Sequence, residues 1–166
     1  MKTTNFAAGM VLLAACSLAH ADTATITVTG KVLPGTCTMA DVPVALADID
    51  ATALKDGHEN NLAAATLNFT NCLGVTNIDL SFDGSADAAQ DGHWQNQATG
   101  GASGIAVALL DGTTGSTFLK KGGKKTVAVS GTTAKLDMRA GYYRKSGTTL
   151  KAGDVSTQIT VTADYR

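Results

Sequence analysis

The side chains that could support catalysis are few and widely spaced. After the first 21 residues the chain contains two histidines, His58 and His93, and both lie in polar segments typical of loops. Neither histidine has the spacing of a metal ligand pair, and no G-x-S-x-G segment marks a nucleophilic serine. A Ser–His–Asp set assembled from distant positions stays open. The residues therefore predict no catalytic group, no metal site and no cofactor.

Acidic side chains offer a weak alternative. Four oxygen-bearing residues loosely follow the spacing of a calcium-binding loop: Asp83, Ser85, Asp87 and Asp91. The EF-hand pattern requires glycine at its sixth position and glutamate at its twelfth, where this chain has Ala88 and Trp94. A solvated loop is the favoured interpretation. Trp94 is interpreted as a core or loop-anchoring residue, with a sugar-stacking platform as the alternative.

A lysine cluster, K120-K121-G-G-K124-K125, is the strongest local concentration of charge. We interpret it as a charged hairpin turn that keeps a sheet edge soluble. The whole chain of 166 residues has a formal charge of −1, so its electrostatics give no reason to expect nucleic acid as a partner. With 44% hydrophobic residues and this length, one domain with a single core is expected.

Residues 1–21 have the pattern of an export signal. Lys2 precedes the apolar run FAAGMVLLAACSLA, and A-H-A at 19–21 is a small-x-small cleavage site. The run is short for a membrane span, which needs about 20 apolar residues. Cleavage after Ala21 is the prediction. The alternative is a lipobox at 13–16, in which Cys16 is lipidated and becomes the first mature residue.

Cleavage of the signal leaves two of the three cysteines, Cys37 and Cys72. An even number in an exported chain suggests one disulfide, with two buried free thiols as the alternative. Such a bond closes a loop of about 36 residues and is worth roughly 4 kcal/mol in the chain-entropy model.

Both ends of the mature chain alternate strictly between apolar and polar residues. Side chains alternate across a strand, so each segment is predicted to have one buried face. Near the end, residues 155–165 carry Val155, Thr157, Ile159, Val161, Ala163 and Tyr165 on that face. At the start, residues 24–32 (ATITVTGKV) carry Ala24, Ile26, Val28, Gly30 and Val32.

Short alternating segments between these ends predict further strands at 36–39, 42–49, 65–72, 78–82, 105–110, 118–119, 127–129 and 136–143. A single helical turn is expected near 51–61, and 83–103 is expected to be a long loop or hairpin. Glycine-rich turn signals every 8–15 residues indicate an all-β sandwich. Neither terminal strand has an obvious neighbour in sequence, which favours a protein that works by assembly.

The chain resembles the pilus subunits of the bacterial chaperone–usher pathway, of the type 1 fimbrial kind. The resemblance covers essentially the whole chain after the signal. It rests on ATITVTGKV, on Cys37 within VLPGTCTM, on VALADIDATAL, and on a second cysteine ending LNFTNC. It rests further on IDLSFDGSAD, GIAVALLDGTTG, and a C-terminal signature of Gly153, fourteenth from the end, with penultimate Tyr165.

The resemblance implies an incomplete immunoglobulin-like β-sandwich that lacks its final strand and is completed by donor-strand complementation. Residues 1–21 are then the signal peptide, 22–33 the donor extension and 34–166 the pilin domain. Ala24, Ile26, Val28, Gly30 and Val32 are expected to enter a neighbour's groove, with Gly30 where the groove is shallow. This subunit's own groove is expected to be bounded by Gly153, Val155, Ile159, Val161 and Tyr165, and Cys37 and Cys72 to pin its first strand.

The function implied is a structural subunit of a cell-surface fimbria that polymerises head to tail and supports cell adhesion. Its implied partners are other pilus subunits, a periplasmic fimbrial chaperone and the outer-membrane usher. The alternative is a minor, tip-proximal subunit that binds a glycan or host protein directly through residues 83–103. Whether the subunit is major or minor stays open.

Overall fold

A computed structural model describes residues 25–166. The chain divides into two units, residues 1–31 and 32–166, which are described separately. In the first unit, the described residues 25–31 have no regular secondary structure, so the strand predicted at 24–32 is not formed there. The expected signal peptide, its cleavage site, Cys16 and Ala24 lie outside the described residues.

The second unit is built from antiparallel strands, as its alternating sequence predicts. The strands are β1 (Thr38–Met39), β2 (Glu59–Thr70), β3 (Asn77–Gly84), β4 (Trp94–Gln95), β5 (Ile105–Asp111), β6 (Lys124–Ala128), β7 (Ala134–Arg144) and β8 (Ile159–Tyr165). A single 3₁₀ turn, η1 (Ala51–Ala53), is the helical turn expected from the sequence.

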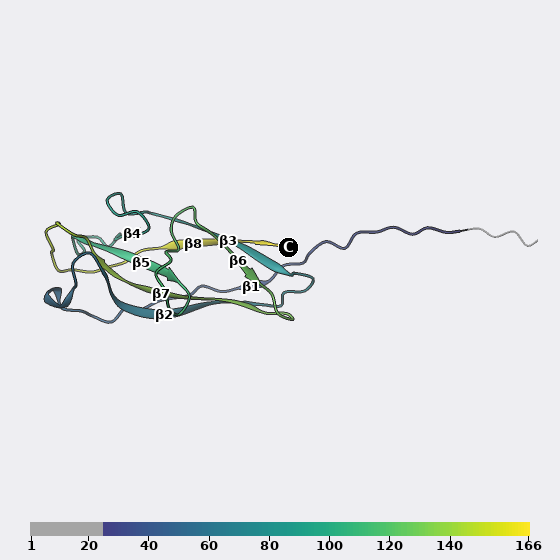
Figure 1. Ribbon diagram of the computed structural model, residues 1–166, viewed down its shortest axis with the longest axis horizontal. Coiled ribbons are helices and arrows are strands. Elements are labelled where there is room, and N and C mark those ends of the chain that lie inside the picture. Colours follow the sequence, from purple (N-terminus) through teal and green to yellow (C-terminus); the bar gives the residue numbers. More distant parts are fainter. Residues whose placement is uncertain (1–24) are drawn as a thin grey trace, which may run out of the picture. The chain divides into compact units, whose positions relative to one another are not determined.

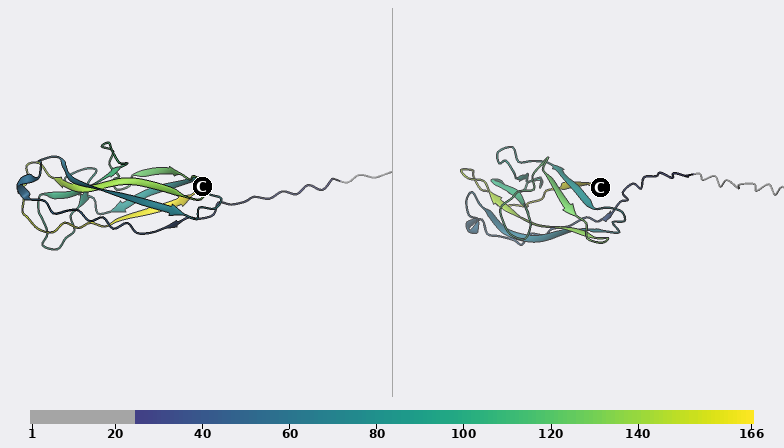
Figure 2. Two further views of the ribbon diagram at one scale, coloured as in Figure 1. Left: turned by 90° about the horizontal axis from the view of Figure 1, so that it is seen from below. Right: turned by 45° about the vertical axis from the view of Figure 1, so that its right-hand side comes forward.

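The strands form two sheets. One has the order β1-β2-β7-β5-β4 and the other the order β6-β3-β8. Figure 1 shows β3 and β8 side by side in one layer and β2 and β7 in the other, and Figure 2 shows both layers from two further directions. The all-β sandwich expected from the sequence is therefore confirmed.

Each sheet contributes its apolar face to one core between the layers. In β3 the alternate residues Ile78, Leu80 and Phe82 are fully buried, because the period of two places them all on the inner face. The opposite sheet supplies Leu67 and Phe69 from β2, together with Val107, Leu109, Leu136 and Met138 from β5 and β7. The described residues include no helix with the length and apolarity needed to cross a membrane.

Several predicted elements differ from the structure. Residues 42–49 form no strand, although Val42, Val44 and Leu46 are half-buried as the alternation requires. Pro43 lacks a backbone N–H and cannot donate to a ladder there. At the end of the chain the ladder begins only at Ile159, because β3 ends at its partner, Gly84. Residues 155–158 therefore alternate in burial without belonging to a strand.

Two smaller differences concern loops. The predicted loop at 83–103 contains β4, which pairs with β5 through Trp94 and Val107. The lysine cluster is only partly a turn, because Lys124 and Lys125 already belong to β6 and pair with β3. In both places, pairing with a neighbouring strand extends regular structure into a segment whose composition is typical of turns.

Candidate functional site

An apolar groove runs along the second unit between two chain segments that share no ladder. Its first wall is the segment 39–46 and its second wall is the segment 155–161, with a volume of about 550 Å³ between them. The floor comes from the large sheet and is formed by Leu67, Val107, Leu109, Met138, Ala140 and Tyr142. Core side chains of the sandwich are thus accessible from the gap between its two sheets.

The groove continues toward the turn before β2. A second depression of about 570 Å³ shares Leu46, Tyr142 and Val155 with the first. It reaches Leu54 on one side and Gly153 on the other. Together the two depressions are lined by residues 150–161, which include the start of β8.

The second wall has an unpaired edge. β8 pairs with β3 on one side only, and no other strand within residues 25–166 pairs with it. Its side chains Ile159, Val161, Ala163 and Tyr165 pack against the core and are only half-buried. An edge strand presents free N–H and C=O groups, so β8 can accept a further strand on its groove side.

Two side chains hold the end of the first wall by hydrogen bonds, because no strand pairs with it there. The carbonyl oxygen of Ala47 accepts hydrogen bonds from Asn61 Nδ2 at 2.7 Å and from the Tyr142 hydroxyl at 3.3 Å. Asn61 has a φ of 51° and lies in a register shift of β2, which directs its amide out of the sheet. Burial, with a smaller contribution from the Asp48 carboxylate, raises the pKa of Tyr142, so its hydroxyl remains a donor.

A covalent bond and a hydrogen bond fasten the groove at the β1 end. Cys37 and Cys72 form a disulfide, which confirms the pairing expected from the sequence. The Tyr165 hydroxyl donates to the Cys37 carbonyl oxygen at 3.3 Å, so the penultimate residue joins the end of β8 to the residue just before β1. Figure 1 shows the C-terminus close to β1.

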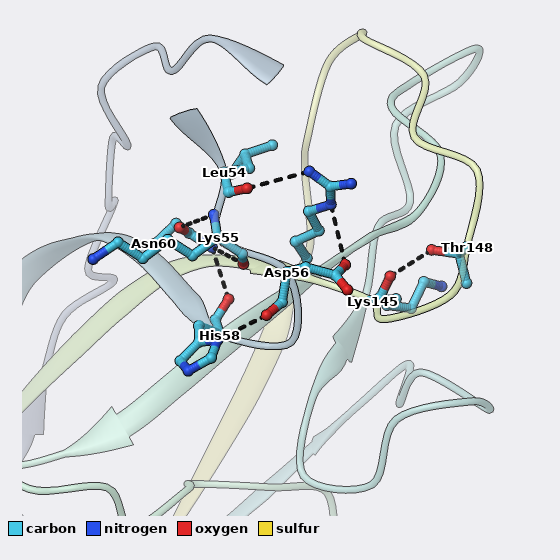
Figure 3. Close-up of polar contacts among 8 residues, drawn as sticks. Leu54, Lys55, Asp56, His58, Asn60, Lys145 and Thr148 are labelled. Atoms are coloured by element: carbon cyan, nitrogen blue, oxygen red, sulfur yellow. Dashed lines mark hydrogen bonds and ion pairs between the residues drawn. The ribbon is translucent and has the colours of Figure 1, made fainter. Parts of the chain in front are cut away.

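A polar cluster fixes the opposite end, around Leu54 (Figure 3). Arg144 donates to the Leu54 carbonyl oxygen at 3.2 Å and pairs with Asp56 at 3.2 Å. Asn60 is buried, and its amide accepts from Lys55 N at 2.8 Å and donates to the His58 carbonyl oxygen at 2.7 Å. The His58 ring contacts the Asp56 carbonyl oxygen at 2.7 Å. This cluster shapes the turn into β2.

Gly153 lies where two loops approach closely. A β-carbon there would be 2.7 Å from the Ala102 nitrogen and 2.8 Å from the Gly101 carbonyl carbon. Such a separation is shorter than side-chain carbons tolerate, and both neighbours are backbone atoms. Only glycine fits without moving the second wall.

The extension expected to act as a donor has an exposed apolar face where it is described. Ile26 and Val28 are each 87% exposed, and Val32 is 95% exposed. Nothing lies within 4 Å of the position that a β-carbon on Gly30 would occupy. Large exposed aliphatic side chains at a spacing of two indicate a face that another surface covers.

The residues first considered for chemistry do not converge on a site. Trp94 is fully buried and its Nε1 donates to the Leu119 carbonyl oxygen at 3.0 Å, so it anchors a loop and cannot stack against a sugar. Each candidate calcium ligand that carries a charge pairs with a lysine: Asp83 with Lys121, Asp87 with Lys145 and Asp91 with Lys120. Within the part of the chain that the structure describes, no three His, Cys, Asp or Glu side chains are placed to hold a metal ion.

His93 is buried against aromatic rings. Its ring lies 3.8 Å from that of Tyr143 and 4.7 Å from that of Phe118, centroid to centroid. Burial lowers the pKa of His93, although the hydrogen bond to the Asp91 carbonyl oxygen and, to a smaller extent, the Glu59 carboxylate 3.9 Å from its Nε2 oppose that shift. The packed imidazole is a structural residue of the loop before β4.

Sequence reasoning missed the polar side chains that hold the walls. Asn61 lies in the segment expected to be a helical turn, Tyr142 in a segment interpreted only for its apolar periodicity, and Asn96 in a segment expected to be a loop or hairpin. The sequence gives little indication of which backbone groups these side chains bind. An amide residue beside a strand has many possible backbone partners, and only the fold selects one.

Comparisons with known proteins identify the family. A family model described as fimbrial protein matches residues 26–166. The S-fimbrial adhesin protein SfaS of Escherichia coli strain 536 is 30% identical, covering 99% of this chain and 98% of its own. Protein FimG of Escherichia coli strain K12 is 36% identical, covering 74% of this chain and 71% of its own.

Solved structures share the fold. The P pilus rod subunit PapA has a TM-score of 0.63 at 16% identity, covering 80% of this chain and 100% of its own. It is similar in architecture, and at that identity the likeness concerns the fold alone. The family match extends over most of the chain, from the exposed extension to the last residue of β8 and beyond. The chain therefore belongs to the fimbrial protein family and is a subunit of that kind.

Proposed function

We propose that the chain polymerises by donor-strand exchange, with residues 24–32 of one subunit filling the groove of the next. The observation that carries the proposal is the unpaired edge of β8 beside an apolar groove whose floor is the sandwich core. Chaperone–pilin donor-strand complementation is an established instance of strand addition to a sheet edge. The extension offers the matching part, an exposed apolar face with a spacing of two.

The contacts available are sufficient for a stable joint. Ile26, Val28 and Val32 with Ala24 are expected to enter the groove, against Val155, Ile159, Val161 and Tyr165. Burying the three larger aliphatic side chains at roughly 1.5–3 kcal/mol each contributes about 4.5–9 kcal/mol before ordering costs. Ladder hydrogen bonds to the open edge of β8 then fix the register and direction of the donor.

The same proposal assigns the rest of the chain. Residues 1–21 direct export and are removed after Ala21, residues 22–33 form the donor extension, and residues 34–166 form the pilin domain. A periplasmic chaperone covers the groove until assembly, and an outer-membrane usher releases the subunit into a surface fimbria. Relatives in the family are structural fimbrial proteins and adhesins, and we assign this chain no catalytic role.

Substitution of Gly30 tests the donor role. Gly30→Trp places a large side chain on the inserting face, whereas the matched control Thr29→Trp places the same side chain on the opposite face. Both positions lie in the extension, where residue 30 has open space around it. We expect filaments with Thr29→Trp and none with Gly30→Trp, by electron microscopy of purified chain. Equal polymerisation of both variants contradicts the proposed insertion.

A receptor-binding role is the second candidate, because one relative similar along its whole length is named an adhesin. Trp94 is buried and does not contribute to such a site, so the remaining exposed part of 83–103 would carry it. A glycan array probed with the chain bound to a peptide of residues 22–33 tests this role. Specific binding that persists with the groove filled supports it, and a blank array excludes glycans as the receptor.

A further inference from the structure

Residues 155–158 of the second wall have no neighbouring strand, whereas residues 159–161 pair with β3. β3 pairs with β8 from Ile78 opposite Tyr165 to Gly84 opposite Ile159, and then turns away. Residues 154–158 continue without a neighbouring strand, yet residues 155–158 line the groove. Unsupported backbone at this point would leave the wall free to move and a donor without a fixed partner.

Two consecutive amide residues after β4 replace the missing strand. Asn96 Oδ1 accepts from Ser156 N at 2.9 Å, and Asn96 Nδ2 donates to the Asp154 carbonyl oxygen at 3.0 Å. Gln97 N donates to the Ser156 carbonyl oxygen at 2.7 Å, and Gln97 Oε1 accepts from Gln158 N at 3.2 Å. We call Asn96 and Gln97 the amide bracket.

The bracket itself is held in place. Asn96 is half-buried, and the remaining capacity of its amide is used by the Ala102 carbonyl oxygen at 3.0 Å and by Ala98 N at 3.1 Å. Gln97 Nε2 donates to Ser85 Oγ at 3.1 Å. An asparagine with all four hydrogen-bonding positions occupied has one side-chain orientation, so it acts as a rigid support.

The bracket keeps the hydrogen-bonding phase of the ladder that it extends. Arg166 exchanges both backbone hydrogen bonds with Asn77, at 2.9 and 3.0 Å, so even-numbered residues of β8 direct their backbone groups toward β3. The residues that the bracket binds, Asp154, Ser156 and Gln158, are even-numbered as well. The edge facing the bracket is therefore continuous with the edge facing β3.

The same alternation decides which residues direct their backbone groups toward the groove. The odd-numbered residues Val155 and Thr157 direct their N–H and C=O groups toward the groove, in line with those of Ile159 and Val161. None of the hydrogen bonds found within residues 25–166 uses the backbone of Val155 or Thr157. The free backbone groups of the odd-numbered residues thus continue in one row from Val155 through β8 to Tyr165.

We propose that Asn96 and Gln97 are positioning residues for strand insertion, which set the register of residues 154–158 so that the donor pairs along the whole wall. The inference rests on the proposed donor-strand exchange and deepens it. Without the bracket's side-chain hydrogen bonds, only the backbone bonds from residue 97 N to the Ser156 carbonyl oxygen and from Ala102 N to the Asp154 carbonyl oxygen hold this segment. The donor then pairs firmly with β8 alone, and the half of the joint next to Gly153 opens readily.

Amide-resolved hydrogen exchange of the full chain tests this role. The chain is refolded with an excess of a peptide of residues 22–33, and protection is compared at Val155 and Thr157 with protection at Val161 and Ala163. In the wild type the peptide is expected to protect all four amides. In the double variant Asn96→Ala, Gln97→Ala, protection at Val155 and Thr157 falls by about tenfold or more, the factor expected from losing one or two hydrogen bonds.

Two further variants keep the test interpretable. Gln95→Ala removes an exposed neighbouring amide that makes no side-chain hydrogen bond within the described residues, and wild-type protection is expected at all four amides. The milder Gln97→Ala keeps the backbone bond to Ser156 and is used if the double variant does not fold. It is expected to lose protection at Thr157 and keep it at Val155.

The outcomes separate the two proposals. If the peptide protects none of the four amides in the wild type, donor-strand exchange is wrong. If it protects all four in the wild type and equally in the double variant, strand exchange stands and the bracket has no positioning role. The same conclusion applies if Gln97→Ala leaves Thr157 fully protected. Loss of protection at Val161 and Ala163 as well would assign the bracket to overall stability and overturn the proposal.

Discussion

Reduction of the Cys37–Cys72 disulfide is expected to weaken both the fold and the groove. The bond joins residues separated by 35 positions, and the loop that it closes contains the whole first wall. For a loop of this length the chain-entropy relation gives a stabilisation of about 4 kcal/mol. Since small domains are stable by only about 5–15 kcal/mol, this is a large share of the total.

The structure also predicts which part of the chain loses stability first. After reduction, the start of the first wall is held by β1, which pairs only through Thr38 with Thr70 and Met39 with Phe69, and by the Tyr165 hydroxyl on Cys37. This wall should therefore loosen before the strands of the core separate. The affinity for a peptide of residues 22–33 is expected to fall along with the free energy of unfolding.

Urea denaturation of the peptide-bound chain, with and without reductant, measures the effect. The double variant Cys37→Ala, Cys72→Ala serves as control, because reductant should leave its unfolding midpoint unchanged. A loss of about 3–5 kcal/mol on reduction of the wild type agrees with the loop argument. A loss below about 1 kcal/mol, the size of an average point mutation, would refute the reasoning that the bond constrains the first wall.

Three further predictions concern single residues. Gly153→Ala should lower the free energy of unfolding by about 1–3 kcal/mol in denaturant titrations, because the new carbon would lie 2.7 Å from Ala102 N. Trp94→Phe should cost about 1–3 kcal/mol in the same assay, since it leaves the Leu119 carbonyl oxygen buried without its donor. His93 has a pKa lowered by burial, so its unfolded form binds protons more readily. Stability should be retained above about pH 6.5 and fall as pH drops below it, and His93→Gln should flatten that slope.

Alternation in the sequence predicted burial better than it predicted hydrogen bonding. Val42, Val44 and Leu46 are half-buried on one face, as their spacing requires, yet no strand forms there. The same holds for Val155 and Thr157. A period of two reports which side chains share a face, whereas a strand also needs a neighbour at hydrogen-bonding distance. Within residues 25–166 no strand pairs with the groove side of either wall, and the proposed function assigns that side to a donor strand.

Strand lengths failed for a related reason. β2 begins at Glu59, several residues before the alternating segment 65–72 that predicted it. The early part was not predicted because a register shift between Asn60 and Ala63 interrupts the alternation there. A bulge breaks the period that sequence reasoning follows. The disulfide pairing could be predicted, since removal of the expected signal leaves two cysteines and therefore one possible pair. The contacts of Asn61 and Asn96 could not be, because they join segments far apart in the sequence.

We propose that the open edge of β8 pairs with residues 24–32 of another subunit. An experimental structure of the chain refolded with a peptide of residues 22–33 would show this pairing. We expect the peptide as a strand between the segment 39–46 and β8, with Ile26, Val28 and Val32 facing the floor of the groove. A groove that stays empty, or a peptide bound with Thr25, Thr27 and Thr29 facing the floor, would contradict the claim.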